Sequence, residues 1–147
     1  MARTSINAGA VKMDASEGGA LTDYSNEIIT ATLTIPRKNS THHTLGLPGG
    51  VVVVGKYSGT LQITYEAGTT ATALHNLISV MATDSTPSAR SFEVGTPDLS
   101  STGSIKFAFE AHLVNAEAVK VDAGGDGVQI LSATFEIEGA ITQTVVT

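Results

Sequence analysis

Residues 131–138 have the sequence Leu-Ser-Ala-Thr-Phe-Glu-Ile-Glu, and this stretch decides the fold class. Apolar and polar side chains alternate in it without a break, which is typical of an extended strand with one buried face and one wet face. The apolar positions continue beyond it, so a long strand is expected within residues 128–142. Its buried face would hold Leu131, Ala133, Phe135, Ile137 and Ile141, and its wet face Ser132, Thr134, Glu136 and Glu138.

The same alternation predicts further strands at residues 27–35, 51–54, 57–66, 90–94 and 104–114. Residues 118–121 are expected to turn through a glycine-rich stretch, 124–127, into the last strand as a hairpin. The side chains expected to face away from the core on these strands are Thr30, Thr32 and Thr34, then Thr60, Gln62, Thr64 and Glu66, and finally Lys106, Glu110 and His112.

One segment has a helical period instead. Leu74, Leu77, Ile78 and Met81 follow the i, i+3, i+4, i+7 spacing of a single apolar stripe, which predicts a helix at about residues 70–82. Thr69 or Thr70 is expected to cap its start, and residues 83–87 to end it. We therefore expect one domain, residues 1–147, that is mainly β: an antiparallel sandwich or barrel with one flanking helix.

Two long segments lie outside these elements. Residues 1–20, rich in Ala, Gly and Ser, are expected to form an extended N-terminal arm, and residues 36–50 a long polar loop that contains Pro36, Pro48 and two glycines. Both could reach a neighbouring subunit, and both could simply be mobile.

Composition narrows the possible functions. The chain has 147 residues, no cysteine, a formal net charge of −6 and only 15% charged residues, with 20 threonines and 13 serines. A thiolate metal site and a cysteine nucleophile are excluded, and the few Lys and Arg argue against binding to nucleic acid by phosphate neutralisation. No stretch approaches the roughly 20 apolar residues of a membrane span, and the N-terminus lacks the apolar run of a secretory signal.

No motif indicates an enzyme, a metal site or a cofactor. The His42-His43 pair has no carboxylate within ten residues, so it lacks the further ligands that a metal would need. Glu136 and Glu138 project from one face about 7 Å apart, within the range of a glycosidase pair, but the chain has no Trp to stack on a sugar. His75 and His112 are expected to be solvated.

The order of these features resembles the tail tube (major tail) proteins of long-tailed bacteriophages. The resemblance spans about residues 20–140. It rests on a segment of the kind Thr-Asp-x-Ser-x-x-Ile leading into the first strand (22–28), a Ser-Gly-Thr strand after the long loop (58–60), and a closing strand of the kind Ala-x-Phe-x-x-x-Gly (133–139). The tube protein of type VI secretion has a similar fold.

The resemblance implies a structural virion protein whose copies form rings of six, stacked into a tube through which the genome leaves. It implies partners in a tape-measure protein and a tail terminator, a place in the virion tail, and assembly in the host cytoplasm. The N-terminal arm would order on assembly. The long loop would contact the next subunit or ring through Arg37, Lys38, His42 and His43.

A tube wall for DNA needs a wet face that does not grip phosphates, and a neutral or acidic strand face meets that need. The side chains expected to line the lumen are Thr60, Gln62, Thr64, Glu66, Thr134, Glu136 and Glu138. Three alternatives stay open: a trimeric head-decoration protein, a carbohydrate-binding β-sandwich with Tyr24 as its exposed aromatic, and an enzyme.

Overall fold

The structure is a computed structural model that describes residues 10–147 apart from positions 17, 38, 54–57, 69, 71, 97, 98, 100 and 121–128. The elements in chain order are β1 (Ala10–Asp14), β2 (Leu21–Asp23), β3 (Ile28–Thr34), β4 (Ser40–Thr44), β5 (Leu47–Val53), β6 (Thr60–Glu66), α1 (Leu74–Thr83), β7 (Arg90–Thr96), β8 (Ile105–Ala116) and β9 (Ile130–Val145).

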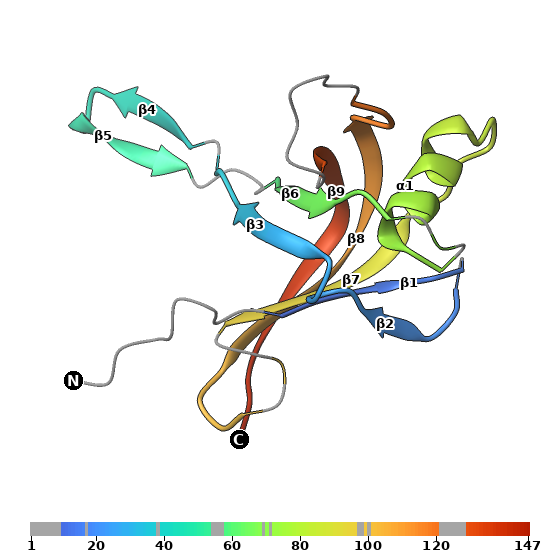
Figure 1. Ribbon diagram of the computed structural model, residues 1–147. Coiled ribbons are helices and arrows are strands. Elements are labelled where there is room, and N and C mark those ends of the chain that lie inside the picture. Colours follow the sequence, from blue (N-terminus) through green and yellow to red (C-terminus); the bar gives the residue numbers. More distant parts are fainter. Residues whose placement is uncertain are drawn as a thin grey trace.

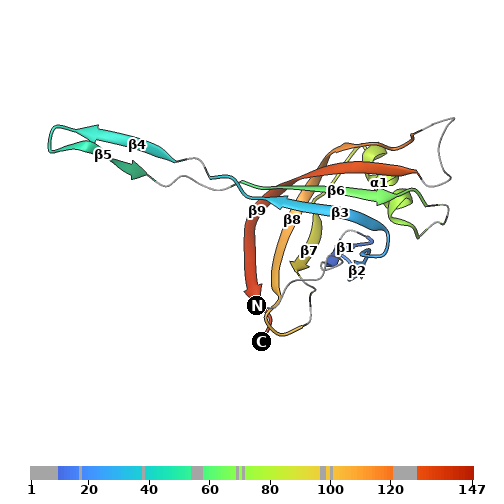
Figure 2. The same cartoon turned by 60° about the vertical axis from the view of Figure 1, so that its left-hand side comes forward.

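Seven of the strands form one antiparallel sheet in the order β2-β1-β7-β8-β9-β6-β3. The sheet curls strongly, so that it forms a half-barrel with α1 beside one end and β3 on the other side (Figures 1 and 2). The predicted mainly β, antiparallel fold with one helix is confirmed, as a single curled sheet and not as two stacked ones.

The core fills the concave face of this half-barrel. The predicted buried faces of β6 and β9 are confirmed for Leu61, Leu131, Ala133 and Phe135, whereas Ile137 and Ile141 are partly buried and pack against this core. Phe135 meets the ring of Phe92 edge to face at 4.9 Å, and Phe92 stacks on Phe109 at 5.5 Å. These aromatic contacts join β9, β7 and β8 in the middle of the sheet.

The helix covers one end of the core, but its start differs from the prediction. Leu74, Ile78 and Met81 of the apolar stripe are buried, and the helix ends at Thr83 as expected. The residue before the helix, Ala73, has no capping side chain, and the Leu74 N–H donates to Oε1 of Glu27 at 3.0 Å. The carboxylate of Glu27, which is distant in sequence, therefore replaces the expected threonine cap. Thr69 lies outside the described residues.

The predicted long loop at 36–50 is wrong. The chain there forms the hairpin β4–β5, with Ser40 paired with Val53 and Thr44 with Leu47. A register shift lies between His42 and Thr44. Opposite it Gly50 has a φ of +81°, and a Cβ at this position would lie 2.9 Å from the His43 ring. Because L side chains rarely adopt this backbone conformation, glycine favours the bulge.

The predicted N-terminal arm is wrong for its second half. Residues 10–14 are strand β1 of the main sheet, paired with β7 and β2, with Val11 and Met13 buried. Residues 1–9 lie outside the described residues. The predicted separate strand at 118–121 is also wrong, because β8 itself pairs with β9; the glycine-rich stretch of that hairpin lies outside the described residues.

Within the described part of the chain, no helix is long and apolar enough to cross a membrane.

Candidate assembly surfaces

The convex face of the sheet, which points away from the core, carries all seven residues predicted to line a lumen. We call it the outer face. In the β6–β9 register Thr60 lies opposite Glu136, and Gln62 opposite Thr134. Thr64 lies opposite Ser132, and its Oγ1 is 2.6 Å from Oγ1 of Thr30 on β3. The residues brought together here are Thr60, Gln62, Thr64, Glu66, Thr134, Glu136 and Glu138.

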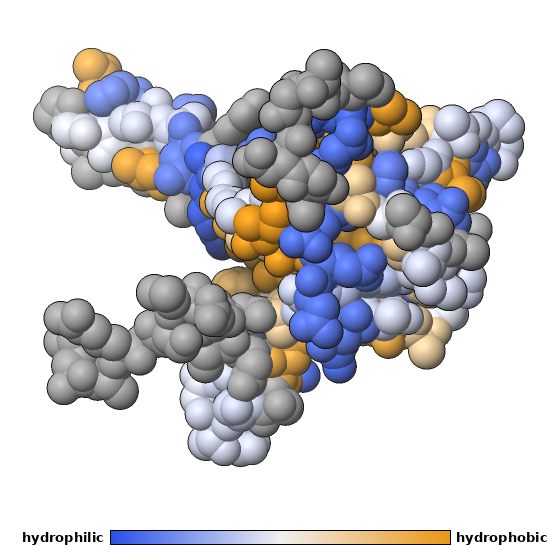
Figure 3. Space-filling view, in the orientation of Figure 1, coloured by the Kyte–Doolittle hydropathy of each residue, from blue (hydrophilic) through white to orange (hydrophobic). Residues whose placement is uncertain are grey.

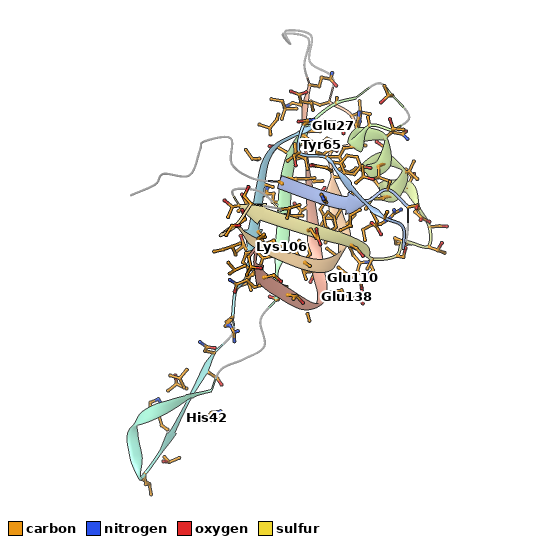
Figure 4. The ribbon with its side chains drawn as sticks, turned by 90° about the horizontal axis from the view of Figure 1, so that it is seen from below. Glu27, His42, Tyr65, Lys106, Glu110 and Glu138 are labelled. Carbon is orange, nitrogen blue, oxygen red and sulfur yellow. The ribbon has the colours of Figure 1, made fainter. Side chains whose placement is uncertain are left out.

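The acidic part of the outer face extends onto β8. Glu110 lies opposite Glu138, and the two are side by side in Figure 4. His112 lies opposite Glu136, and its Nε2 is 2.8 Å from Oε2 of Glu138. The exposed His112 side chain is thus hydrogen-bonded to the carboxylate of Glu138. The carboxylates of Glu110, Glu136 and Glu138 repel one another in this arrangement.

A bulge in β9 sets this arrangement. The β8–β9 register shifts between Ala108 and Glu110, and Gly139, next to Glu138, has a φ of 76°. Glycine adopts this backbone conformation without a steric penalty, so β9 can bend here and bring Glu138 opposite Glu110. Lys106 lies beyond the bulge, opposite Thr144.

The hairpin β4–β5 is the second candidate surface. It extends away from the half-barrel as a long thin arm (Figure 2), and His42 lies far out on it (Figure 4). Every side chain of β4 is exposed, and Leu45 at the tip is 106% exposed. His43 is also on β4, and Arg37 is at the base of the arm; Lys38 lies outside the described residues.

The polar contacts at the helix end of the half-barrel hold the fold together. The Tyr65 hydroxyl donates to the Glu117 carbonyl at 3.2 Å, and Nε2 of His75 lies 2.7 Å from the Ala118 carbonyl. His75 is half-buried, so its side chain is partly solvated and also hydrogen-bonded to the backbone. Burial raises the pKa of Tyr65 to about 12, and the carboxylate of Glu117 adds to this effect.

At the opposite edge, the side chain and backbone N–H of Ser25 both donate to Asp23. These hydrogen bonds lower the pKa of the Asp23 carboxyl and outweigh its slight burial. Since β2 is the last strand on that side, this turn fixes the edge of the sheet.

One of the alternatives left open by the sequence, a carbohydrate-binding β-sandwich, lacks the contact residue expected for it. Tyr24 is buried, so it is not the exposed aromatic that a sugar-binding face would need. Among the described residues no group of three or more His, Asp or Glu side chains is placed to hold a metal ion.

The sequence matches no family model and no curated protein. Solved structures match its fold over almost the whole chain. A chain from the tail of an empty GTA particle, refined with C6 symmetry, has a TM-score of 0.67 at 13% identity and covers 98% of this chain and 100% of its own.

Two further solved structures give similar values. A chain in the six-fold symmetrised baseplate of the anti-feeding prophage (AFP) has a TM-score of 0.70 at 13% identity and covers 100% of this chain and 99% of its own. A chain in the sheath–tube complex of the extracellular contractile injection system PVC has a TM-score of 0.69 at 9% identity. The match covers 98% of this chain and 93% of that chain. The resemblance to tail tube proteins is therefore confirmed at the level of the fold.

Proposed function

We propose that this chain is a structural subunit that self-assembles into the tube of a phage-like tail. The observation that carries the proposal is the match of the whole fold, over 97–100% of this chain, to chains of tail and injection particles. Because the matches cover 97–100% of this chain, they extend over the hairpin β4–β5 as well as the half-barrel. A non-enzymatic role agrees with them.

The hairpin β4–β5 supports self-assembly because the subunit leaves it without a core. Two-stranded hairpins are at best marginally stable in water, and this one exposes Leu45 and Val52 at its tip and side. Residues 40–53 contain no Asp, Glu, Lys or Arg, so burying the arm against another copy costs no charge desolvation. We propose that the arm, with Arg37, Lys38, His42 and His43, contacts the next subunit or ring.

We further propose that the outer face lines the lumen. With Glu66, Glu136, Glu138 and Glu110 among hydroxyl side chains, it repels the phosphates of a passing genome and so reduces their adhesion to the wall. The copies would form rings of six, and the tube would work with a tape-measure protein and a terminator in the virion tail after assembly in the host cytoplasm.

Electron microscopy of the purified protein over a concentration series tests the proposal. Tubes or six-fold rings that increase with concentration are expected. Trimers would favour a head-decoration protein, and a monomer at every concentration would contradict self-assembly. Turnover of a substrate that depends on His112 or Glu138 would instead favour an enzyme.

The lumen assignment has its own test in particles that eject DNA. Replacing Glu66, Glu136 and Glu138 by Gln should slow ejection while tubes still form, because the wall loses its repulsion of phosphate. Asp84→Asn, which removes a charge at the end of α1, is the control and should eject normally. Normal ejection by the triple variant would show that this face does not line the lumen.

A further inference from the structure

The described residues leave part of the concave side of the half-barrel open. A groove of about 800 Å³ lies between β3 on one side and β1, β7 and β8 on the other. We call it the barrel groove. Among the described residues that line it, none is charged. Figure 3 shows hydrophobic surface in the hollow below β3.

Three isoleucines of this lining keep much of their surface in water. Ile29 on β3 is 48% exposed, and Ile35, just after β3, and Ile105 on β8 are each 37% exposed. Apolar surface gathered in a hollow is typical of a binding site, because water gains by leaving it. The barrel groove is therefore a candidate docking site for an apolar segment.

Two strand edges beside the groove are free to pair within the described chain. β3 pairs only with β6. The pairing of β6 with β9 ends at Glu136, so residues 139–145 of β9 pair only with β8. Neither β3 nor residues 139–145 contain a charge or a proline that would keep another strand away. The groove and its edges together suit an extended segment with an apolar surface.

The hairpin β4–β5 has the properties that this groove requires. Leu45 at its tip is 106% exposed, and Val52 on β5 is 59% exposed. Residues 40–53 contain no Asp, Glu, Lys or Arg, so burial in an uncharged groove leaves no charge without a partner. Other exposed apolar residues are less suited: Ile130, for example, lies opposite Glu66 and would bring a carboxylate with it.

The hairpin cannot enter the groove of its own subunit. It begins after β3 ends and extends away from the half-barrel (Figure 2), whereas the groove runs back along β3. Leu45 follows Ile35 by ten residues, which span up to about 33 Å when extended. The hairpin that fills a barrel groove must therefore come from a second copy of the chain.

We propose that the hairpin of one copy docks in the barrel groove of the next copy, with Leu45 packed against the exposed isoleucines of the groove. The inference rests on the proposed self-assembly and names the surface that receives the arm. Hairpin and groove are different parts of the surface, so the contact is heterologous: a docked pair still has a free hairpin at one end and a free groove at the other. Repetition of such a contact builds closed rings or continuing helical assemblies.

Engineered cysteines test the contact directly, because the native chain contains none. Leu45→Cys is mixed during assembly with Ile29→Cys, Ile35→Cys or Ile105→Cys, and one partner carries a short tag so that mixed dimers have their own mobility on a non-reducing gel. At least one of the three mixtures should give mixed disulfide-linked dimers.

Leu45→Cys mixed with Val80→Cys or Ile130→Cys is the matched control, because these exposed apolar residues lie outside the groove. The control mixtures should give far fewer mixed dimers. Tubes or rings without a cross-link to any groove position would overturn this inference and leave self-assembly standing. Cross-links to the groove in a protein that forms neither tubes nor rings would support the docking and contradict the proposed tube.

Complementing defects give an independent test. Ile29→Asp places a charge in the groove and Leu45→Asp places one on the hairpin, so neither variant alone should build tubes. In a mixture, the intact hairpin of Ile29→Asp should dock in the intact groove of Leu45→Asp, and sedimentation should show pairs that neither variant forms alone. Because Ile29 is half exposed, its variant should unfold at a denaturant concentration close to that of the native protein. Normal tubes from Ile29→Asp alone would overturn the inference.

Discussion

The half-barrel and the hairpin β4–β5 are built from the same kind of strand, yet they are stabilised in different ways. Strands β6 and β9 bury one face completely, with Leu61 and Phe135 inaccessible to water. In the hairpin every side chain of β4 is exposed, and its two strands form a sheet of their own (Figure 1). The half-barrel therefore has a core of its own, whereas the hairpin projects from it with its side chains exposed.

The largest effect on stability is expected at the centre of the half-barrel. Phe135→Ala should lower the free energy of unfolding by about 3–5 kcal/mol, because it leaves a cavity against the rings of Phe92 and the neighbouring strands. Denaturant unfolding measures the loss. A loss below about 1 kcal/mol would mean that the aromatic cluster does not carry the core.

Alkaline pH should weaken the helix-covered end of the half-barrel through Tyr65. Its pKa is about 12 in the folded protein and about 10 when unfolded, so the folded state binds its proton more tightly. The stabilisation is complete below pH 10 and is lost as pH rises toward 12, on the order of 2 kcal/mol for this group.

The comparison is between the native protein and Tyr65→Phe. The variant gives up the hydrogen bond to the Glu117 carbonyl, about 1 kcal/mol at neutral pH, but should then lose less stability between pH 10 and 12. Tyr24→Phe is a second test, because burial also raises the pKa of Tyr24, and this variant too should lose less stability at alkaline pH. Parallel stability curves for the native protein and Tyr65→Phe would refute the assignment.

A smaller effect is expected at the start of α1. Glu27→Ala removes the acceptor of the Leu74 N–H and should cost about 1 kcal/mol of stability. Glu27→Gln retains an oxygen at the same place and should cost only a part of this. Chemical denaturation ranks the variants, and equal losses for the two would point to the charge of Glu27 and not to its hydrogen bond.

The smallest change in stability should come from the hairpin. Leu45→Asp should alter the free energy of unfolding by no more than about 0.5 kcal/mol, because Leu45 touches little of its own subunit. The same variant should fail to form tubes in electron micrographs. Val80→Asp, an exposed apolar residue on α1, is the matched control and should still assemble. Normal tubes from Leu45→Asp would place the subunit contact elsewhere.

The same contrast explains what the sequence could predict. Strands and helix with one buried face leave a period, so the α1 stripe at Leu74, Ile78 and Met81 and the faces of β6 and β9 could be predicted. β4 is exposed on both faces, and no burial forces its side chains to alternate. The sequence of residues 36–50 therefore predicts a loop and not a hairpin.

The candidate site was predictable to a similar degree. The outer-face positions on β6 and β9 follow from the period alone. The hydrogen bond between His112 and Glu138 cannot be predicted from the period. It depends on the β8–β9 register, which two irregularities shift. The cap on Leu74 was missed for a related reason: Glu27 is 47 residues away along the chain.

The hairpin leaves the half-barrel on one side only (Figure 2). An assembly in which each hairpin docks on the next copy consequently has direction: one end presents free arms, and the other presents unfilled docking surfaces. Growth and termination at the two ends then require different partners, and a protein that stops one end has no reason to fit the other.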